Sequence, residues 1–220
     1  MVLACYAAAS LLIVPQKPKA PEPPFYRDVL EFAKQDAKSR PAKGQILFIG
    51  SSSFTRWTDV GDYFPNHRIL NRAFGGSSLP DVTRYLDRVV FPYAPRQIVI
   101  YCGENDLAGD PRLAAYKVAN RFTTLFRLIR MRLPNVPIVY VSMKPSPSRW
   151  FLRSKFIAAN RWIAEFCARQ RATQFVNVWD AMLDDQGRPK GDIFVDDRLH
   201  MNATGYRIWQ PILEQALVKD

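Results

Sequence analysis

Short β-branched apolar runs alternate with longer segments of helical periodicity, and this alternation restricts the fold more than any other feature of the sequence. The runs that predict strands lie at residues 45–50, 68–74, 96–103, 137–143 and 174–179. Several of them are apolar throughout, which is typical of strands buried on both faces of a parallel sheet. We therefore expect a central, mainly parallel five-stranded sheet.

The segments between these strands have the spacing of amphipathic helices. They lie at residues 25–39, 80–90, 112–132, 153–171 and 204–218. The stretch LAAYKVANRFTTLFRLIRMRL has apolar residues at intervals of three and four and is followed by Pro134, which stops a helix. Strand and helix in alternation predict an α/β fold, a three-layer doubly wound sandwich.

The N-terminal part of the chain differs in composition from the rest. Residues 1–14 are almost wholly apolar, residues 15–24 are rich in proline, and residues 25–220 form the predicted folded domain. An apolar run of this length is short for a membrane-crossing helix, which needs about 20 residues, and Lys17 is the first basic residue. We expect a signal peptide or membrane anchor whose start lies upstream of Met1, followed by an extended spacer.

This reading places the domain outside the cytoplasm, in the periplasm or tethered to a membrane through its N-terminus. The alternative is a short interfacial or poorly ordered N-terminus, and a cytoplasmic location stays open with it.

Charge and cysteine content argue against nucleic-acid binding, a metal site and a disulfide framework. The chain has 31 Lys and Arg against 20 Asp and Glu, a net charge of +11. The basic residues are scattered, with no Lys/Arg run and no RNA-binding aromatic motif, so we expect a solvated basic surface and no specific nucleic-acid partner. The cysteines, Cys5, Cys102 and Cys167, lack the spacing of a metal site or of a disulfide framework. We expect no metal and no organic cofactor.

In an open parallel sheet, functional groups gather beyond the carboxyl ends of the strands. The segments at those ends read GSSSF, FGGSS, CGENDL and SMKPSPS, and the C-terminal segment DDRLHMN precedes the last predicted helix. All of them are rich in polar residues or glycine. The sequence therefore predicts a reaction site where these segments meet.

A histidine is the usual base for a nucleophilic serine, and the chain has two. His67 precedes a strand, so we expect it at the surface and away from the site. His200 follows Asp197 by three residues. A carboxylate at this spacing can orient the imidazole and stabilise the imidazolium that forms on proton transfer.

The serines of GSSSF supply a nucleophile for this pair. A serine between a strand and a helix has its backbone N–H at the positive end of the helix dipole, where it can also donate to an oxyanion. Gly76, where the backbone can approach closely, and the side-chain amide of Asn105 are two further donors. Position alone does not choose among Ser51, Ser52 and Ser53.

The segments FIGSSSFTRW, NRAFGGS, CGENDL and DDRLHMNATGY, in this order, resemble the consensus blocks of the SGNH hydrolases, the GDSL-type esterases and lipases. The resemblance covers residues 44–218 and points to the branch with GSS in the first block. It implies a flavodoxin-like fold and selects Ser52 as the nucleophile. Asp197 and His200 match the other members of its catalytic triad.

The resemblance also assigns the oxyanion hole to Ser52, Gly76 and Asn105. The sequence departs from the family pattern at two positions. Ser51 stands in place of the usual aspartate, and Ala73 stands where glycine is common. Neither change removes a member of the triad.

The activity implied by the resemblance is that of a serine esterase, which hydrolyses carboxylic esters through an acyl-serine intermediate. We expect a short acyl chain on a small-molecule, glycan or lipid ester. An acyltransferase using the same site, or a tethered binding module without turnover, would fit the same blocks. We expect a single, monomeric domain, and the sequence does not indicate how many copies assemble.

Two segments, residues 144–156 and 186–197, are expected to border the site. Trp150, Arg149 and Arg153 in the first are candidate substrate contacts. Simple loop packing is the alternative for Trp150.

Overall fold

The computed structural model describes residues 21–219. The predicted apolar segment 1–14 and residues 15–20 of the proline-rich segment lie outside the described residues, so the expectations about a signal, an anchor and location stay predictions. Among residues 21–219, no helix combines the length and the apolar character that a membrane crossing requires.

The centre of the molecule is a parallel sheet of five strands in the order β2-β1-β3-β4-β5. The strands are β1 (Ile46–Gly50), β2 (Ile69–Asn71), β3 (Gln97–Tyr101), β4 (Ile138–Val141) and β5 (Thr173–Val176). The strand order reverses at β1, which pairs with β2 on one side and β3 on the other. This arrangement confirms the predicted doubly wound α/β sandwich.

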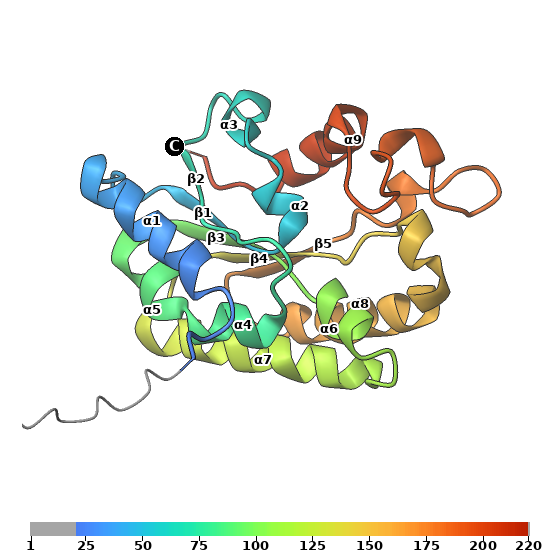
Figure 1. The fold of residues 1–220 in the computed structure, drawn as a ribbon, viewed down its shortest axis with the longest axis horizontal. Coiled ribbons are helices and arrows are strands. Elements are labelled where there is room, and N and C mark those ends of the chain that lie inside the picture. Colours follow the sequence, from blue (N-terminus) through green and yellow to red (C-terminus); the bar gives the residue numbers. More distant parts are fainter. Residues whose placement is uncertain (1–20, 220) are drawn as a thin grey trace, which may run out of the picture.

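Helices cover both faces of the sheet (Figure 1). One face carries α1 (Tyr26–Lys38), α4 (Leu79–Arg84), α5 (Leu86–Val89), α7 (Ala115–Arg132) and α8 (Arg153–Ala168). The other carries α2 (Ser52–Thr55), α3 (Val60–Tyr63) and α9 (Ala203–Glu214). A short helix, α6 (Glu104–Gly109), follows β3, and four 3₁₀ turns complete the described structure: η1 (Phe91–Tyr93), η2 (Pro147–Leu152), η3 (Asp180–Met182) and η4 (Gly191–Ile193).

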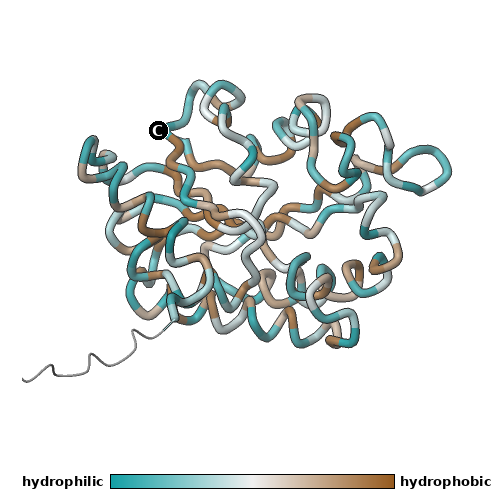
Figure 2. Tube along the Cα trace, in the orientation of Figure 1, coloured by the Kyte–Doolittle hydropathy of each residue, from teal (hydrophilic) through white to brown (hydrophobic). Residues whose placement is uncertain are grey.

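The uniformly apolar strands divide their side chains between two cores. In β1, Leu47 and Ile49 belong to the core beneath α4 and α7, whereas Ile46 and Phe48 belong to the core beneath α2 and α9. Burial of each such side chain stabilises the fold by about 1.5–3 kcal/mol. Figure 2 shows the resulting apolar band along the central strands, with hydrophilic residues on the outer surfaces of the helices.

The predicted elements exist, but several boundaries differ. The helix expected at residues 80–90 is two helices, α4 and α5, because the backbone at Tyr85 leaves the helical region (φ −106°, ψ 14°). The helix expected to begin at the serines of GSSSF is α2, but no range was predicted for it or for α3 and α6, because four to six residues are too few to show a helical period. Strand β1 ends at Gly50 as predicted, whereas the other four strands end two or three residues earlier than expected, because the chain leaves the ladder to enter the loops.

Gly50 ends β1 and allows the chain to turn closely past β3. Its backbone has a φ of +128°, and a Cβ atom at this position would lie 1.9 Å from the Tyr101 carbonyl oxygen. The following residue, Ser51, donates its backbone N–H to that same oxygen over 2.9 Å. Glycine is therefore required here for both its backbone conformation and the absence of a side chain.

We expect Gly50→Ala to lower the free energy of unfolding by more than about 4 kcal/mol, because the new methyl group collides with backbone that cannot move aside. Gly61→Ala in α3 is the matched control, since a Cβ there meets no atom within 4 Å. We expect that variant to stay within about 1 kcal/mol of the parent protein. Urea unfolding followed by circular dichroism measures both. Equal stability of the two variants would contradict this account of Gly50.

Candidate active site

Ser52 lies at the carboxyl end of β1, where it is the first residue of α2. Ser51 before it is extended (φ −111°, ψ −162°), so the chain passes directly from strand to helix. The Ser52 side chain is half-buried, and its Oγ lies 2.8 Å from Nε2 of His200. The structure thus brings together the serine and the histidine that were predicted to react as a pair.

Asp197 holds His200 from the opposite side of the ring. Its Oδ2 lies 2.6 Å from Nδ1 of His200, and its Oδ1 accepts the backbone N–H groups of Leu199 and His200 over 2.9 and 2.8 Å. A carboxylate can only accept, so Nδ1 carries the proton and Nε2 is left to accept from the Ser52 hydroxyl. The imidazole is therefore held in the tautomer that a general base needs.

The carboxylate of Asp197 stays ionised near neutral pH. Partial burial acts to raise its pKa, but hydrogen bonds from the His200 side chain and from backbone N–H groups outweigh burial and hold the pKa well below the ordinary value. Arg56, which the sequence analysis did not select, lies 3.7 Å from the same carboxylate. The site therefore contains a fixed negative charge that can stabilise an imidazolium.

The predicted oxyanion donors are Ser52 itself, Gly76 in the loop beside it, and Asn105, which is bonded to that loop through the Ser77 carbonyl oxygen. Within residues 21–219, the backbone N–H groups of Ser52 and Gly76 donate to no acceptor. The loop that contains Gly76 runs beside the serine, since a Cβ on Gly75 would lie 3.9 Å from the Ser52 Cβ. Gly76 itself has a φ of +79°, a conformation that favours glycine.

Asn105, in the first turn of α6, donates one N–H of its side-chain amide to the Ser77 carbonyl oxygen over 2.9 Å. Within residues 21–219 its second N–H has no acceptor. Together with the two backbone groups, the amide can surround an oxygen atom that becomes negatively charged.

The candidate substrate contacts lie on or next to η2. Trp150 stacks on Trp179 with ring centroids 6.1 Å apart, and the Arg153 guanidinium lies over the Trp150 ring at 5.4 Å. The Ser148 backbone N–H donates to the Arg198 carbonyl oxygen over 3.1 Å, which joins η2 to the loop of Asp197 and His200. The start of η2 thus borders the site, whereas Trp150 packs against Trp179 and the core. Contact of Trp150 and Arg153 with a substrate stays a prediction.

Arg149 is turned toward the site's own residues. Its Nη1 lies 3.2 Å from Oε2 of Glu104, and its Nη2 donates to Oδ1 of Asn105 over 2.8 Å. Substrate contact by Arg149 likewise stays a prediction, but both terminal nitrogens already have partners.

A buried charged cluster lies behind Asn105. Lys144 Nζ lies 3.2 Å from Oε2 of Glu104, and the Tyr101 hydroxyl donates to Oε1 over 2.5 Å. The side chains of Lys144 and Glu104 are only 1% and 5% exposed. This cluster was not predicted, because neither GEND nor SMKPSPS shows that Glu104 or Lys144 turns inward. The one signal in the sequence was that both segments follow neighbouring strands, β3 and β4, so that Glu104 and Lys144 could meet.

Burial and pairing act in opposite directions on this cluster. Burial acts to raise the pKa of Glu104, but the positive charges of Lys144 and Arg149 outweigh it and lower the pKa below the ordinary 4.5. Burial also lowers the pKa of Lys144, against the attraction of Glu104. Removing one partner therefore leaves the other charge buried without compensation.

The expected surface position of His67 is wrong. Its side chain is 4% exposed, and its Nε2 lies 2.9 Å from Oε1 of Glu214 in the segment that ends α9. The residue joins the start of β2 to the last helix, a long-range contact that local sequence does not reveal. Its role is structural and lies away from the strand ends that carry Ser52.

Other features of the described residues lie outside this site. Cys102 and Cys167 are buried free thiols. Within residues 21–219, no group of three or more His, Cys, Asp or Glu side chains is placed to hold a metal ion.

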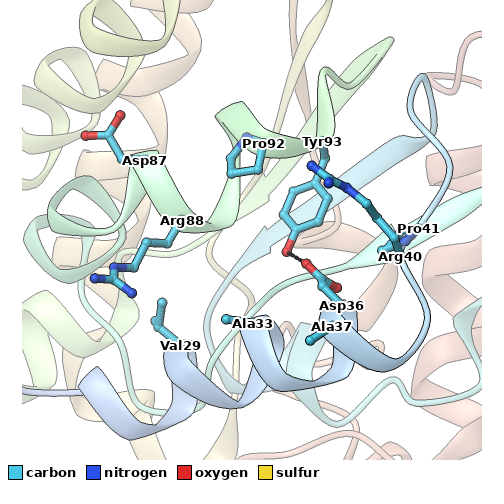
Figure 3. A pocket seen from close by; sticks show the side chains of 10 residues that line it. All are labelled: Val29, Ala33, Asp36, Ala37, Arg40, Pro41, Asp87, Arg88, Pro92 and Tyr93. Carbon is cyan, nitrogen blue, oxygen red and sulfur yellow. Dashed lines mark hydrogen bonds between the residues drawn. The ribbon is translucent and has the colours of Figure 1, made fainter.

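Figure 3 shows a pocket of about 340 Å³ between α1 and η1. It is lined by two carboxylates: Asp36 accepts from Tyr93 over 2.6 Å and pairs with Arg72, and Asp87 pairs with Arg132.

The family model of the GDSL-like lipase/acylhydrolase family matches residues 48–208. No curated protein matches the chain. Solved structures share the fold at low identity. A protein provisionally described as a platelet activating factor, from Streptococcus pneumonia, is 20% identical, with a TM-score of 0.76, over 87% of this chain and 92% of that one.

Two other solved structures have the same fold. A GDSL-like lipase from Bacteroides thetaiotaomicron is 19% identical, with a TM-score of 0.69, over 86% of this chain and 96% of that one. A variant of an acetyl xylan esterase from Geobacillus stearothermophilus is 17% identical, with a TM-score of 0.61, over 81% and 99% of the two chains.

We expect Glu104→Gln to lower the free energy of unfolding at pH 7 by about 3–5 kcal/mol, because Lys144 then keeps a buried charge without its partner. The lowered pKa of Glu104 means that its contribution is present above the ordinary carboxyl pKa and is lost as the pH falls through the native value. The difference in free energy of unfolding between the parent protein and the variant should therefore become smaller at acid pH. Urea unfolding at pH 7 and at about pH 2.5, well below the ordinary carboxyl pKa, measures it.

The double variant Glu104→Gln/Lys144→Met is the control, because it removes both charges. We expect it to recover part of the stability lost at pH 7. A deficit in Glu104→Gln that is equally large at both pH values would contradict an ionic contribution.

Proposed function

The chain belongs to the GDSL-like lipase/acylhydrolase family, and from this premise we propose that it is a serine esterase that hydrolyses carboxylic esters through an acyl-serine intermediate. The observation that carries the proposal is the continuous contact from Ser52 through His200 to Asp197, at 2.8 and 2.6 Å. This geometry lets one proton move from the serine to the imidazole while the carboxylate keeps the ring in place.

In the first half of the reaction, Ser52 Oγ forms a bond to the ester carbonyl carbon as its proton passes to Nε2 of His200. The carbonyl oxygen becomes negative and accepts from the Ser52 and Gly76 backbone N–H groups and from the amide of Asn105. The tetrahedral intermediate collapses, the bond to the alcohol oxygen breaks, and the imidazolium gives its proton to that oxygen. Asp197 stabilises the imidazolium throughout.

In the second half, water takes the place of the alcohol. His200 removes a proton from the water, whose oxygen attacks the acyl carbon, and the same donors stabilise the second oxyanion. The bond to Ser52 Oγ then breaks, and Oγ regains a proton from His200. The products are a carboxylic acid and free enzyme, and each step uses only this chain's residues and water.

We propose a short acyl chain on a small-molecule or glycan ester. The site is open, since the Asp197 side chain is 39% exposed and the neighbouring Phe151 is 67% exposed. One structural neighbour is an acetyl xylan esterase, so the shared fold can act on acetyl esters. Trp150 and Arg153 at the rim are the proposed contacts for the rest of the substrate.

A panel of p-nitrophenyl esters of increasing chain length, given to the purified full chain, tests the reaction and the acyl preference. We expect turnover to be highest for acetate or butyrate and to fall for long chains. A fluorophosphonate probe should label the protein at one serine. Absence of both turnover and labelling would overturn the proposal, whereas a preference for long chains would overturn only the acyl-length part.

Ser52→Ala should reduce kcat by at least about 10⁴-fold, because the nucleophile is removed. Ser51→Ala and Ser53→Ala are matched controls on the same segment and should keep activity within about tenfold of the parent protein, since the serine hydroxyl bonded to His200 is that of Ser52. Steady-state hydrolysis of p-nitrophenyl acetate measures all three variants. Equal activity in Ser52→Ala would move the nucleophile elsewhere.

Asn105→Ala should lower kcat by about 10²–10³-fold, the usual effect of losing one oxyanion donor. The KM should change little, because the donor acts on charge that develops after binding. The same assay measures both constants. A change confined to KM would mean that Asn105 binds substrate and does not stabilise the transition state.

A further inference from the structure

Arg149 makes a contact that bears on the direction of the Asn105 amide. An asparagine side chain can present either its N–H groups or its carbonyl oxygen to a given point, and these two ends have opposite effects on a nearby anion. The N–H end stabilises an oxyanion, whereas the carbonyl end repels it. A donor built from asparagine therefore needs neighbours that fix which end faces the site.

Two neighbours fix the amide of Asn105. The Ser77 carbonyl oxygen accepts from Nδ2 over 2.9 Å, and the Arg149 guanidinium donates to Oδ1 over 2.8 Å. Reversing the amide would set two oxygens against each other at Ser77 and two sets of N–H groups against each other at Arg149. Ser77 is itself held by its hydroxyl, which donates to the Gly50 carbonyl oxygen over 3.0 Å.

Arg149 is in turn held by the buried cluster. Its side chain is 17% exposed, and its Nη1 lies 3.2 Å from Glu104. Glu104 also pairs with Lys144 and accepts from the Tyr101 hydroxyl. The guanidinium therefore has a fixed position, set from strands β3 and β4, before any substrate binds.

The cluster also has an excess of positive charge. Glu104 is one carboxylate between two cations, Lys144 and Arg149. The guanidinium that contacts Oδ1 polarises the amide and makes its N–H groups stronger donors. A positive group at this place, shielded from water, favours negative charge on the far side of Asn105.

We propose that Arg149 is a positioning residue, which holds the Asn105 amide with its free N–H toward the oxyanion and strengthens that donor. This inference rests on the proposed function, because the orientation matters to a reaction only if Asn105 is an oxyanion donor. It replaces the expectation that Arg149 contacts the substrate directly.

The kinetic test uses Arg149→Met and the double variant Arg149→Met/Asn105→Ala. We expect Arg149→Met to lower kcat on p-nitrophenyl acetate by about 10–10³-fold with little change in KM. In the Asn105→Ala background, the same substitution should cause less than a threefold further loss, because its effect passes through Asn105. Additive losses, or a change confined to KM, would overturn the proposal in favour of direct substrate contact.

Arg149→Lys separates positioning from folding. A lysine can still pair with Glu104 but offers one ammonium group in place of the two donors that reach Glu104 and Asn105 together. We expect it to keep the thermal unfolding midpoint of the parent protein and to lose most of the kcat that Arg149→Met loses. Full activity of Arg149→Lys would overturn the proposal. Arg161→Met, which changes an exposed arginine of α8, is the matched control and should keep full activity.

A measurement without substrate distinguishes this inference from the proposed function. The side-chain ¹⁵N–¹H signals of Asn105, assigned by their loss in Asn105→Asp, should be slow to exchange with solvent in the parent protein. In Arg149→Met they should shift and exchange at least tenfold faster. Unchanged signals would overturn the inference even in an active esterase, whereas changed signals in a protein without esterase activity would overturn the proposed function alone.

Discussion

The close passage of β1 along β3 is the contact on which the rest of the site depends. Because Gly50 has no side chain, the backbone of β1 reaches the Tyr101 carbonyl oxygen at the end of the ladder, and Ser51 extends the pairing by one more hydrogen bond. The chain can then turn at once into α2 with Ser52 at its first position. The neighbouring strand, β3, leads within a few residues to Asn105. One backbone contact thus fixes how the segments that carry Ser52 and Asn105 leave the sheet.

The buried charges behind the site are costly to the fold. Each charge that leaves water is penalised by several kcal/mol, and the penalty is offset only where partners and hydrogen bonds are complete. Here Glu104 has contacts from Lys144, Arg149 and Tyr101, and the Lys144 backbone N–H donates to it as well. A hydrophobic cluster of similar volume could fill the same space, but it could not hold the Arg149 guanidinium against Asn105.

The sequence predicted most of the fold because the relevant signals are local. Apolar strands and periodic helices such as α7 can be recognised from a dozen consecutive residues, and their alternation implies the parallel sheet. The site residues were predicted because parallel strands bring their carboxyl ends to one edge, although choosing Ser52 among three serines required the resemblance to a family. The inward turn of Lys144 and the burial of His67 against Glu214 could not be predicted, because each depends on contacts between segments far apart in the chain.

The six residues of η2 contact both halves of the candidate machinery. Arg149 reaches the oxyanion side at Asn105, while Ser148 is bonded to the loop that carries Asp197 and His200. A change in the length of this segment would therefore disturb both at once. The hairpin in which Leu183 pairs with Pro189 has no such double attachment. Insertions and deletions should therefore disturb the candidate site less in that hairpin than in η2.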